Sequence, residues 1–451
     1  MSTMTQLRQL GLFDAKVPRY TSYPTAPHFS DAVGPAEYAD WIADIPPNSD
    51  ISLYVHVPFC RRLCWFCACR TQGTKSDAPV QAYVDTLLSE LDLLKQRLPQ
   101  GTKLARLHWG GGTPTLLPPA LMEKLAGAIF ATAPLAASYE FSVEIDPNEI
   151  DDTRISTLAN LGMNRASIGI QDFDEDIQKT IGRQQSYDIT KKAADALRDV
   201  GIHSLNADIL YGLPHQSREK IADSVQMLLS LSPDRVALYG YAHVPWMARR
   251  QGMIPSDALP TPEERLQLFE TAQQLFAWDS YVDIGIDHFA KHDDGLAVAQ
   301  RAGQLRRNFQ GYTDDTSQVL IGVGASAISR FPQGYAQNQP ATSKYTGALR
   351  DGQFATSRGH AMTPQDALHS RIIEALMCDF KVSTNELLSD YQVSVKELGA
   401  LYQKALSAFP GMVAVTKNGL EIPVKGRPLT RMIARCFDAY ALDQAGHSHA
   451  I

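Results

Sequence analysis

The stretch ISLYVHVPFCRRLCWFCACR, residues 51–70, indicates both the fold and the chemistry of this chain. Its first seven residues are largely apolar and β-branched, which favours a buried strand. Four of the six cysteines follow within ten residues, as Cys60, Cys64, Cys67 and Cys69. Six cysteines in 451 residues do not make a disulfide scaffold. Four of them crowded into one loop indicate a metal site in a reducing compartment.

Downstream of this stretch, short apolar runs alternate with helical patterns, which predicts a series of βα units. Six or seven such units, with strands apolar on both faces, indicate a parallel sheet covered by helices. A doubly wound open sheet and a full or partial TIM-type barrel both fit this periodicity. We expect strands at residues 51–57, 103–109, 139–146, 165–171, 205–212, 235–244 and 281–289, with helices between them.

In either fold the active site lies at the carboxyl ends of the parallel strands. Chemically distinctive residues stand there in every predicted unit, which packing alone does not explain. They are the cysteine loop after the first strand, Gly110–Thr113 after the second, Glu144 and Asp146 on the third, Gln171 and Asp172 after the fourth, Asp208 and Tyr211 on the fifth, Tyr241 and His243 on the sixth, and Asp287 and His288 on the seventh.

The composition of the chain excludes several classes of protein. Hydrophobic residues make up 44% and charged residues 20%, which excludes global disorder. The formal net charge of −7 argues against a dedicated nucleic-acid binder. The first residues lack the apolar core of a signal peptide, and no apolar run approaches the ~20 residues of a membrane span. We therefore expect a cytoplasmic protein that binds neither nucleic acid nor membrane.

The two flanks of the βα series differ from it in pattern. The N-terminal flank contains the aromatic, proline-rich PRYTSYPTAPHF. Residues 290–360 are rich in Gly, Asn and Gln and are interpreted as loop, with one apolar stretch at 319–328. The predicted regions are an extension covering the site (1–50), a barrel with its covering loops (51–360), and a mainly helical domain (361–451) with a two-stranded hairpin at 412–424 that turns at Asn418–Gly419.

The C-x3-C-x2-C spacing, with an aromatic residue before the third cysteine, resembles the signature of the radical S-adenosylmethionine (SAM) superfamily. A structural zinc site, the alternative, normally uses two separated pairs of ligands. The resemblance implies that Cys60, Cys64 and Cys67 hold three irons of a [4Fe–4S] cluster, while the fourth iron stays open to chelate SAM. One electron would then split SAM and release a 5′-deoxyadenosyl radical. Cys69 would be functional without being a ligand, because a fourth thiolate would close the open position.

Other residues at the strand ends are candidates for ligand contacts because they lie near the cysteine loop in the predicted fold. The Gly110–Gly112 run leaves backbone amides free to approach a ligand, although it equally fits a plain tight turn. Glu144 would bond the ribose hydroxyls of SAM or form a salt bridge inside the barrel. Arg183 and Asp208 would contact a ligand or pair with each other. The histidines at the strand ends are more simply explained as satisfied core or rim residues.

Over nearly its whole length the chain resembles the oxygen-independent coproporphyrinogen III oxidases, a radical SAM family of haem biosynthesis. The radical SAM haem chaperones are the alternative, but they generally lack the fourth cysteine and the N-terminal extension. The resemblance rests on PRYTSYPT (18–25), YVHVPFCRRLCWFCACR (54–70), LHWGGGTPT (107–115), EIDPNEI (144–150), GIQDFDEDIQKTIGR (169–183), ADILYGLP (207–214), DHFA (287–290), RNFQGYT (307–313) and RCFDAY (435–440).

This resemblance implies an α/β fold: an incomplete TIM-type (β/α)6 barrel, open enough to admit a tetrapyrrole, with an N-terminal extension and a helical C-terminal domain. It also implies a [4Fe–4S] cluster and two SAM molecules. Contacts to the cluster-bound SAM are implied for Tyr54, Gly111, Glu144 and Ile328; contacts to a second SAM for Phe66, Gly112, Thr113, Gln171, Arg183, Asp208 and Ala242; and catalytic roles, at or over the reacting centre, for Cys69, Phe309, Gln310, Tyr20 and Arg19.

The implied reaction is the anaerobic oxidative decarboxylation of two propionates of coproporphyrinogen III to vinyl groups, giving protoporphyrinogen IX. The substrate carries four carboxylates, for which bidentate arginines are the best partners, and Arg19, Arg306 and Arg307 are the candidates. An electron donor protein such as flavodoxin or ferredoxin and a monomeric state are also expected. A haem chaperone would instead bind haem without making a vinyl product, and a pure binding module would not cleave SAM.

Overall fold

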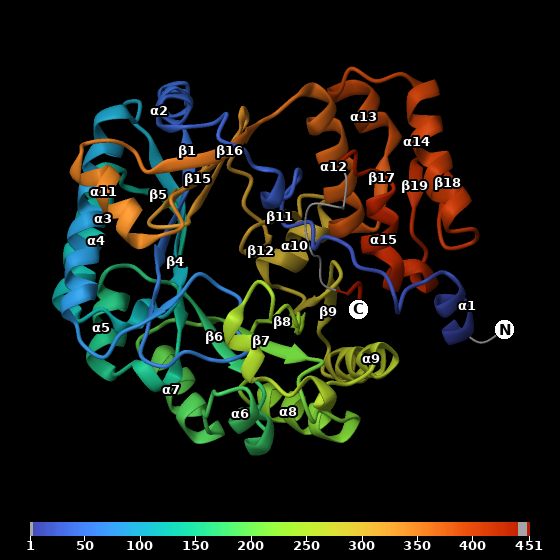
Figure 1. Cartoon of the computed structure of the whole chain (residues 1–451), viewed down its shortest axis with the longest axis horizontal. Helices are drawn as coiled ribbons and strands as arrows, with labels where there is room; N and C mark the ends of the chain where they lie inside the picture. The colour runs from blue at the N-terminus through green and yellow to red at the C-terminus, as the bar shows by residue number, and fades with distance from the viewer. Residues whose placement is uncertain (1–2, 441–448) are drawn as a thin grey trace.

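The computed structural model describes residues 3–440 and 449–451, and its centre is a sheet of 12 strands (Figure 1). Six strands follow one another along the chain and pair in parallel with their neighbours. Their common direction brings six carboxyl ends to one edge of the sheet, as the βα pattern predicts. These strands are β1 (Asp50–Val57), β4 (Lys103–Gly111), β5 (Leu135–Ile145), β6 (Arg165–Gln171), β7 (Ser204–Tyr211) and β8 (Arg235–Gly240).

Helices connect the parallel strands and cover the sheet (Figure 1). Their first turns follow ordinary capping chemistry: the side chains of Asp151, Ser217 and Thr261 each accept a hydrogen bond from a first-turn amide. The strands are buried, and the rings of Trp109 and Phe141 pack 5.3 Å apart in the core. The helices are α3 (Ala78–Arg97), α4 (Pro119–Thr132), α5 (Asp152–Asn160), α6 (Glu175–Thr180), α7 (Tyr187–Asp199), α8 (Arg218–Ser230) and α9 (Pro262–Trp278).

The stretch 281–289 is not the seventh parallel strand that its pattern predicts. It splits into β9 (Val282–Ile284) and β10 (His288–Ala290), which pair antiparallel, and β10 is also antiparallel to β8. Gly285, at φ 55°, adopts a left-handed conformation that interrupts the strand. The seventh parallel strand is β13 (Leu320–Val323), which lies in the apolar stretch 319–328 and pairs with β1.

Residues 290–360 are mostly regular structure, so their interpretation as loop is wrong. Their polar residues are buried with partners: Asn338, on a fully buried strand, donates a hydrogen bond to the Glu90 carboxylate at 2.6 Å. The two outermost strands of the sheet, β16 and β9, do not pair, so the barrel stays incomplete as expected. The elements are α10 (Gly295–Arg301), β11 (Arg306–Asn308), β12 (Gly311–Thr313), β14 (Ile328–Phe331), β15 (Gly334–Asn338), α11 (Thr342–Arg350) and β16 (Thr356–Ala361).

The C-terminal part of the chain lies to one side of the barrel (Figure 1). It is mainly helical, and the predicted hairpin forms with a third strand added to it, but its two-residue turn is Lys417–Asn418, one residue before the predicted position, because Gly419 already pairs with Thr416. Its elements are α12 (Pro364–Asp379), β17 (Lys381–Ser383), α13 (Thr384–Asp390), α14 (Val395–Ala408), β18 (Ala414–Thr416), β19 (Gly419–Glu421) and α15 (Thr430–Arg435).

The N-terminal extension divides between two hydrophobic cores. Leu7, Leu12 and Phe13, around α1 (Thr3–Gln9), pack into the core of the C-terminal helices. In contrast, α2 (Pro35–Ala43) packs on the barrel through Tyr38 and Ile42. The extension therefore ties the barrel to the C-terminal helices. Across the described residues, no helix combines the length and the apolarity that crossing a membrane requires.

Candidate active site at the carboxyl ends of the strands

The cysteine loop begins where β1 ends and is closed by a short ladder. β2 (Phe59–Cys60) and β3 (Gln72–Gly73) pair in parallel, and the Thr74 amide donates to the Cys60 carbonyl at 3.0 Å. Residues 61–71 therefore form a loop whose two ends are held together. Of the predicted ligands, Cys64 and Cys67 lie on this loop and Cys60 lies directly before it.

Three hydrogen bonds and one close packing contact from distant segments fix the loop from outside. The Trp65 amide donates to the Ile181 carbonyl at 2.9 Å. A side chain at Gly182, which has φ 69°, would collide with the Trp65 ring at 2.9 Å, so glycine permits this packing. On the other side, the Gln251 amide donates to the Phe66 carbonyl at 2.7 Å, and Arg250 donates to the Cys69 carbonyl at 3.3 Å.

The thiols of the loop face a common, partly buried space. Burial, partly opposed by a hydrogen bond with Thr113 and reinforced by the neighbouring Cys67 and Cys64, raises the pKa of Cys60 to about 11. Arg183 donates to the Cys64 sulfur at 3.7 Å. A hydrogen bond with Cys69 lowers the pKa of the Cys67 thiol. Thiolate ligands would thus form beside a guanidinium and two hydrogen-bond donors.

This donor set fits an iron–sulfur cluster better than a single metal ion. Within the described ranges, no three His, Cys, Asp or Glu side chains gather closely enough to hold one ion. A [4Fe–4S] cluster does not need such convergence, because each thiolate binds a different iron of the cube. Cys60, Cys64 and Cys67 provide three such thiolates on one loop, with Trp65 and Phe66 between them.

The Gly110–Gly112 run lies directly against this loop. The Gly112 amide donates to the Val57 carbonyl and the Thr113 amide to the Phe59 carbonyl, both at 2.8 Å. A Cβ atom on Gly112 would lie 2.5 Å from the Phe59 carbonyl oxygen, and one on Gly111 would lie 2.5 Å from the His56 ring. The glycines are therefore needed for close approach of β4 to the cysteine loop, not for the turn alone.

Glu144 turns toward the glycine run rather than into a salt bridge with a Lys or Arg. Its Oε2 accepts from the Gly111 amide at 3.0 Å, and its Oε1 lies 3.4 Å from Nε2 of His108. Burial would raise the pKa of Glu144, but the hydrogen bonds from His108 and Gly111 outweigh burial and lower it. The carboxylate is ionised at neutral pH and keeps room on its half-exposed side for a ligand hydroxyl.

Tyr54 joins the same group from β1. Its hydroxyl lies 2.9 Å from Nδ1 of His56, and its ring stacks on His108 at 5.7 Å. Ile328 lies at the start of β14, which continues the sheet beyond β13. Tyr54, Gly111 and Glu144 therefore form one contact group on β1, β4 and β5, and Ile328 joins the sheet two strands from β1.

The residues predicted for a second SAM occupy the next strands. Arg183 pairs with Asp146 at 3.5 Å, so the alternative of an Arg183–Asp208 pair is wrong. Asp208 is instead held by Asn206 at 2.8 Å. Gln171 ends β6 at φ 73°, an uncommon left-handed conformation for a side-chain-bearing residue. The other members are Phe66 and Ala242, whose carbonyls both accept from Gln251, and Gly112 and Thr113 on the glycine run.

The remaining predicted residues lie farther from the cysteine loop. Arg19 donates to the Gly240 carbonyl at the end of β8, at 2.6 Å. The Tyr20 hydroxyl donates to Asp438 at 2.9 Å, so it ties the extension to the C-terminal helices. Phe309 packs 5.7 Å from the Tyr335 ring. Gln310 is exposed, Arg306 is half-buried on β11, and Arg307 is buried.

Sequence reasoning missed several residues that build the site. Gln251 bonds both Phe66 and Ala242 from a short helical turn that shows no recognisable motif. The His56 ring is hydrogen-bonded through Nδ1 to the Tyr54 hydroxyl and through Nε2 to the Arg70 carbonyl, the latter at 3.1 Å. Asp146, noted only as a strand-end residue, holds Arg183. The EIDP segment at the end of a predicted strand is the one sequence signal that could identify Asp146 as a site residue. No sequence signal identifies Gln251.

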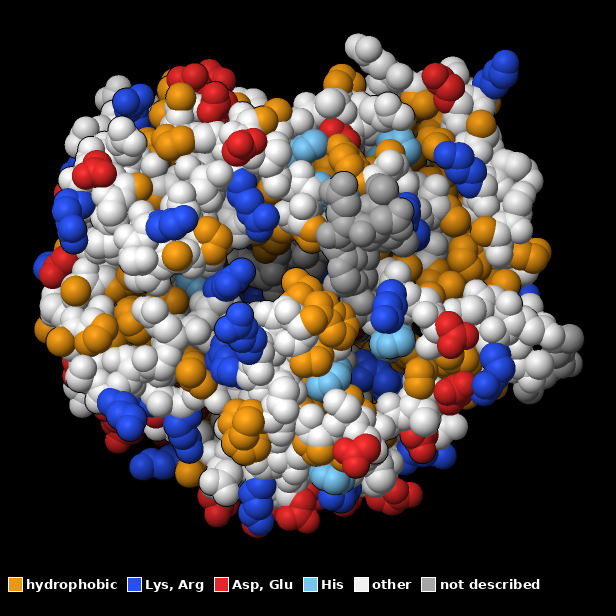
Figure 2. Space-filling view, viewed as in Figure 1, with side chains coloured by type: hydrophobic (Ala, Val, Ile, Leu, Met, Phe, Trp, Pro, Cys, Tyr) orange, Lys and Arg blue, Asp and Glu red, His pale blue; other side chains and the backbone are white. Residues whose placement is uncertain are grey.

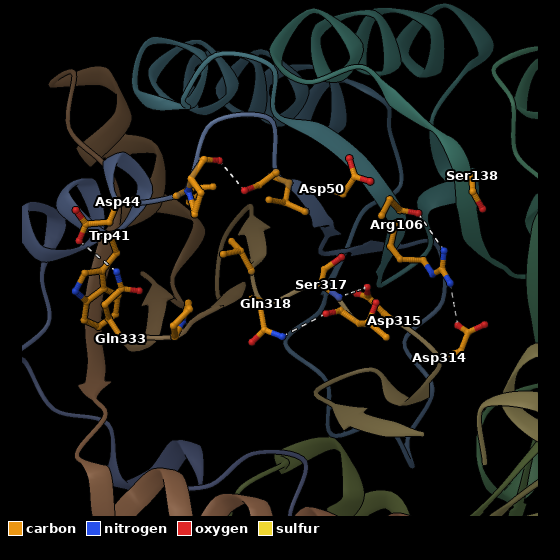
Figure 3. Close-up of a pocket in the computed structure, with 18 residues that line it drawn as sticks. Trp41, Asp44, Asp50, Arg106, Ser138, Asp314, Asp315, Ser317, Gln318 and Gln333 are labelled. Carbon is orange, nitrogen blue, oxygen red and sulfur yellow. Dashed lines mark hydrogen bonds and ion pairs between the residues drawn. The ribbon is translucent and has the colours of Figure 1, made fainter. Parts of the chain in front are cut away.

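A cavity of about 510 Å³ lies at the other end of the barrel (Figure 3). It is lined by Asp50 and Ile51 at the start of β1 and by Arg106 near the start of β4. Figure 3 shows Arg106 turned toward Asp314, to which it is bonded at 3.1 Å. The cavity contains none of the predicted site residues, and its position at the amino ends of the strands separates it from the cysteine loop.

The face of the molecule seen in Figure 2 has a hollow at its centre, with Lys and Arg side chains gathered on its rim. Such a rim attracts anionic ligands, although the whole chain is acidic. The net charge therefore conceals a local positive region.

Comparisons with known proteins place these features in a context. Residues 54–228 match the model of the Radical SAM superfamily. The chain is 63% identical over 451 residues to an oxygen-independent coproporphyrinogen III oxidase of Paracoccus denitrificans (strain Pd 1222), with 100% of both chains covered. It is 37% identical over 430 residues to the enzyme of the same name from Escherichia coli (strain K12), covering 95% of this chain and 94% of that protein. A solved structure of coproporphyrinogen III oxidase from Escherichia coli, described as a radical SAM enzyme, is similar at a TM-score of 0.90 and 35% identity, covering 95% of this chain and 100% of that chain.

Proposed function

Because this chain belongs to the oxygen-independent coproporphyrinogen III oxidases, a radical SAM family, we propose how its residues divide the work of that reaction. The activity is oxygen-independent oxidation of coproporphyrinogen III through radical SAM chemistry. In chemical terms, each of two propionates loses one hydrogen atom, CO2 and one electron and becomes a vinyl group, which gives protoporphyrinogen IX; the 5′-deoxyadenosyl radical would take the hydrogen atom, and a one-electron acceptor the electron. The observation that carries the assignment to a site is the contact between the cysteine loop and the glycine run, with Glu144 bonded to that run.

Cys60, Cys64 and Cys67 would hold the [4Fe–4S] cluster in this scheme. When bound, the cluster and SAM supply the one-electron chemistry that produces a 5′-deoxyadenosyl radical. The chain's own contribution is positional: Arg183 donates to Cys64, and Gln251 and Arg250 hold the loop from its outer side. Cys69 is placed beside Cys67 and is proposed to act as a functional neighbour, not as a ligand.

Glu144, Gly111, Tyr54 and Ile328 are proposed to bind the SAM next to the cluster. Glu144 is ionised, and each of its oxygens has one protein partner, Gly111 or His108, so the remaining lone pairs suit ribose hydroxyls. The Gly111 and Gly112 amides are not free, because they already donate to Glu144 and to the Val57 carbonyl, so the glycine run would offer SAM its carbonyl oxygens. Close backbone approach, which the glycines permit, is what a small polar ligand needs.

A second SAM molecule is proposed on β6, β7 and the cysteine loop. In support, Gln171 and Arg183 both lie close to Gly169, where an added Cβ would be 3.2 Å and 3.3 Å from their nitrogens. The residues of this proposed site are Phe66, Gly112, Thr113, Gln171, Arg183, Asp208 and Ala242. Equilibrium dialysis with labelled SAM tests the stoichiometry: two molecules per chain in the wild type and one in Asp208→Ala support it, and one in both overturns it.

Phe309, Gln310, Tyr20 and Arg19 are proposed to face or cover the tetrapyrrole. Phe309 and Gln310 lie in the turn between β11 and β12, and Arg19 lies at the carboxyl end of β8. We also propose that a flavodoxin or ferredoxin delivers the electron, that the chain acts as a monomer, and that it works in the cytoplasm, where thiols stay reduced. Light scattering on a sizing column tests the monomer.

Anaerobic turnover is the experiment that tests the function. Reconstituted protein is incubated with coproporphyrinogen III, SAM and a reductant, and the products are analysed by mass. Formation of protoporphyrinogen IX together with methionine and 5′-deoxyadenosine is expected. SAM cleavage without any vinyl product would contradict the activity and favour haem binding, which is measured in parallel by absorbance titration.

A further inference from the structure

Four arginines from distant parts of the chain meet beyond the ends of β7 and β8. Arg19 donates to the Gly240 carbonyl, and Arg265 donates to the next carbonyl, that of Tyr241, at 2.8 Å. Arg431 donates to the carbonyls of Val17 and Pro18, directly before Arg19.

Arg307 faces the same space from β11. Its Nη1 lies 3.7 Å from Asp287. Asp287 in turn experiences the charge of Arg19 as well as that of Arg307. Residues from the N-terminal extension, α9, β11 and α15 therefore form one cluster of positive charge.

Few acidic side chains neutralise this cluster. In the part of the chain that the structure describes, Arg307 has one Asp or Glu neighbour within 4.0 Å, Asp287, and Arg19, Arg265 and Arg431 have none, although Nε of Arg265 donates to the main-chain oxygen of Ile451 at 3.1 Å. Buried charges are ordinarily paired, because desolvating an unpaired ion costs several kcal/mol. The mutual repulsion is visible in Arg431: burial, and next the charge of Arg19, lower its pKa to about 9.

Two of these guanidinium groups retain donors that nothing in the described chain accepts from. The side chain of Arg307 is 5% exposed, yet its Nε and Nη1 have no hydrogen-bond acceptor. Its guanidinium instead lies over the Tyr312 ring, 4.5 Å from the centroid. Arg19 is half-buried, and the structure gives it one hydrogen bond, to the Gly240 carbonyl. By contrast, every guanidinium nitrogen of Arg265 and Arg431 donates to at least one main-chain oxygen, so these two act as fixed charge behind the other two.

We propose that Arg19 and Arg307 form a carboxylate-binding pocket that holds one propionate of the tetrapyrrole, with Arg265 and Arg431 as fixed positive charge behind it. The proposal rests on the proposed function for the identity of the carboxylate. A planar carboxylate is the natural partner of a guanidinium fork with free donors, since two parallel N–H···O bonds form at once. The anchored propionate would be one that keeps its carboxylate, because a carboxylate held by a guanidinium fork is not free to leave as CO2.

The pocket continues into the interior that holds the SAM residues. The Tyr239 hydroxyl lies 3.4 Å from Nε2 of His288, and Nδ1 of His288 lies 2.7 Å from Asp287. Asp208, on the strand next to β8, experiences the charge of both Glu144 and His288. A tetrapyrrole anchored at Arg307 would therefore extend past Tyr239 toward Glu144 and the glycine run.

Binding of coproporphyrin III, the oxidised and unreactive form of the substrate with all four carboxylates, tests the pocket without turnover. Reconstituted wild type, Arg19→Gln and Arg307→Lys are titrated with coproporphyrin III and followed by Soret absorbance. Arg307→Lys keeps the charge but removes the fork, and Arg350→Gln, at an exposed position on α11, is the matched control. We expect the Kd for coproporphyrin III to rise at least tenfold in Arg19→Gln, at least fivefold in Arg307→Lys, and less than twofold in Arg350→Gln.

SAM affinity, measured on the same preparations, distinguishes the source of the carboxylate. Unchanged SAM affinity in both variants supports a propionate pocket. An equal loss of SAM affinity overturns the proposal, because the pocket would then hold the carboxylate of SAM. Unchanged coproporphyrin III affinity in folded Arg19→Gln and Arg307→Lys, with wild-type melting temperatures, also overturns it. If the wild type forms no vinyl product in the turnover assay, the proposed function fails, and this result is independent of the titration.

Discussion

The carboxylate of Glu144 on β5 accepts a hydrogen bond from the backbone amide of Gly111 on β4, at 3.0 Å. The two strands are neighbours in the parallel sheet. This bond makes the acidic side chain and the glycine run a single unit, since neither can shift without the other. His108 holds the second carboxylate oxygen of the same side chain.

Replacing Glu144 by Gln should weaken SAM binding about tenfold, which corresponds to ~1.4 kcal/mol. The amide keeps one acceptor for Gly111 but loses the charge, and charge-assisted hydrogen bonds contribute more than neutral ones. Equilibrium dialysis with the reconstituted protein measures the effect. Glu123→Gln, at an exposed position on α4, is the control and should bind SAM normally. Equal affinity in the two variants would remove Glu144 from the SAM site.

Gly112→Ala should prevent assembly of the cluster. The added methyl group would lie 2.5 Å from the Phe59 carbonyl oxygen and 2.9 Å from its amide nitrogen, and backbone atoms cannot move aside cheaply. Iron and sulfide content per chain after reconstitution gives the readout. Gly127→Ala on α4, where nothing lies within 4 Å, should keep full cluster content and gain up to about 1 kcal/mol of stability. A Gly112→Ala protein with a full cluster would show that the close approach is unimportant.

Tyr20→Phe should destabilise the junction between the extension and the C-terminal helices by about 1–3 kcal/mol. The change leaves Oδ2 of Asp438, whose side chain is 4% exposed, without its hydroxyl donor. Limited proteolysis of the first residues should accelerate, and urea should unfold the variant earlier. Tyr187→Phe, whose hydroxyl bonds Ser230 at the surface, should change stability by less than about 0.5 kcal/mol. Equal proteolysis rates would contradict the role given to Tyr20.

Asp287 should contribute a pH-dependent part of the stability. Burial would raise the pKa of this carboxyl, but Arg307, His288 and Arg19 lower it to about 2. A carboxyl whose pKa is lower in the folded state than in the unfolded state stabilises the fold at pH values above its unfolded pKa of about 4. This stabilisation is lost as the pH falls toward 2. Asp287→Asn should therefore be less stable than the wild type at pH 7, by about 3 kcal/mol, since Arg307 loses its buried partner. Melting temperatures recorded from pH 7 to pH 3 should converge at the acid end; a constant difference would argue against the ion pair.

Much of the barrel could be predicted from the sequence, because each of its parallel strands from β1 to β8 is a short apolar run separated from the next by a helical pattern. These six strands and the hairpin are confirmed, although the hairpin turns at Lys417–Asn418, one residue before the predicted position. The prediction failed where polar residues are buried with distant partners. Asn338 lies on a buried strand because Glu90, 248 residues away, accepts its hydrogen bond, and no local pattern reports such a pair.

The same limit applies to the site. The three predicted cluster ligands and the glycine run lie in contiguous motifs whose spacing is readable. The partner of Arg183, in contrast, could not be predicted from a contiguous motif. It is Asp146 and not Asp208, because the relative positions of β5, β6 and β7 decide which carboxylate lies near the guanidinium. Gln251 donates to the Phe66 carbonyl of the cysteine loop from 185 residues further along the chain, and no local pattern connects these two positions.

By itself the sequence determined the succession of six parallel strands along the chain, the cysteine loop after β1 and the family to which the chain belongs, because these follow from local periodicity and contiguous motifs. Only the tertiary structure decided that Arg19, Arg265, Arg307 and Arg431 meet at one place where, among the described residues, Asp287 is the single Asp or Glu within 4.0 Å of a guanidinium. The physical reason is that charge compensation depends on distance in space. Four arginines scattered from the N-terminal extension to α15 each resemble an ordinary solvated side chain until the fold brings them together away from water.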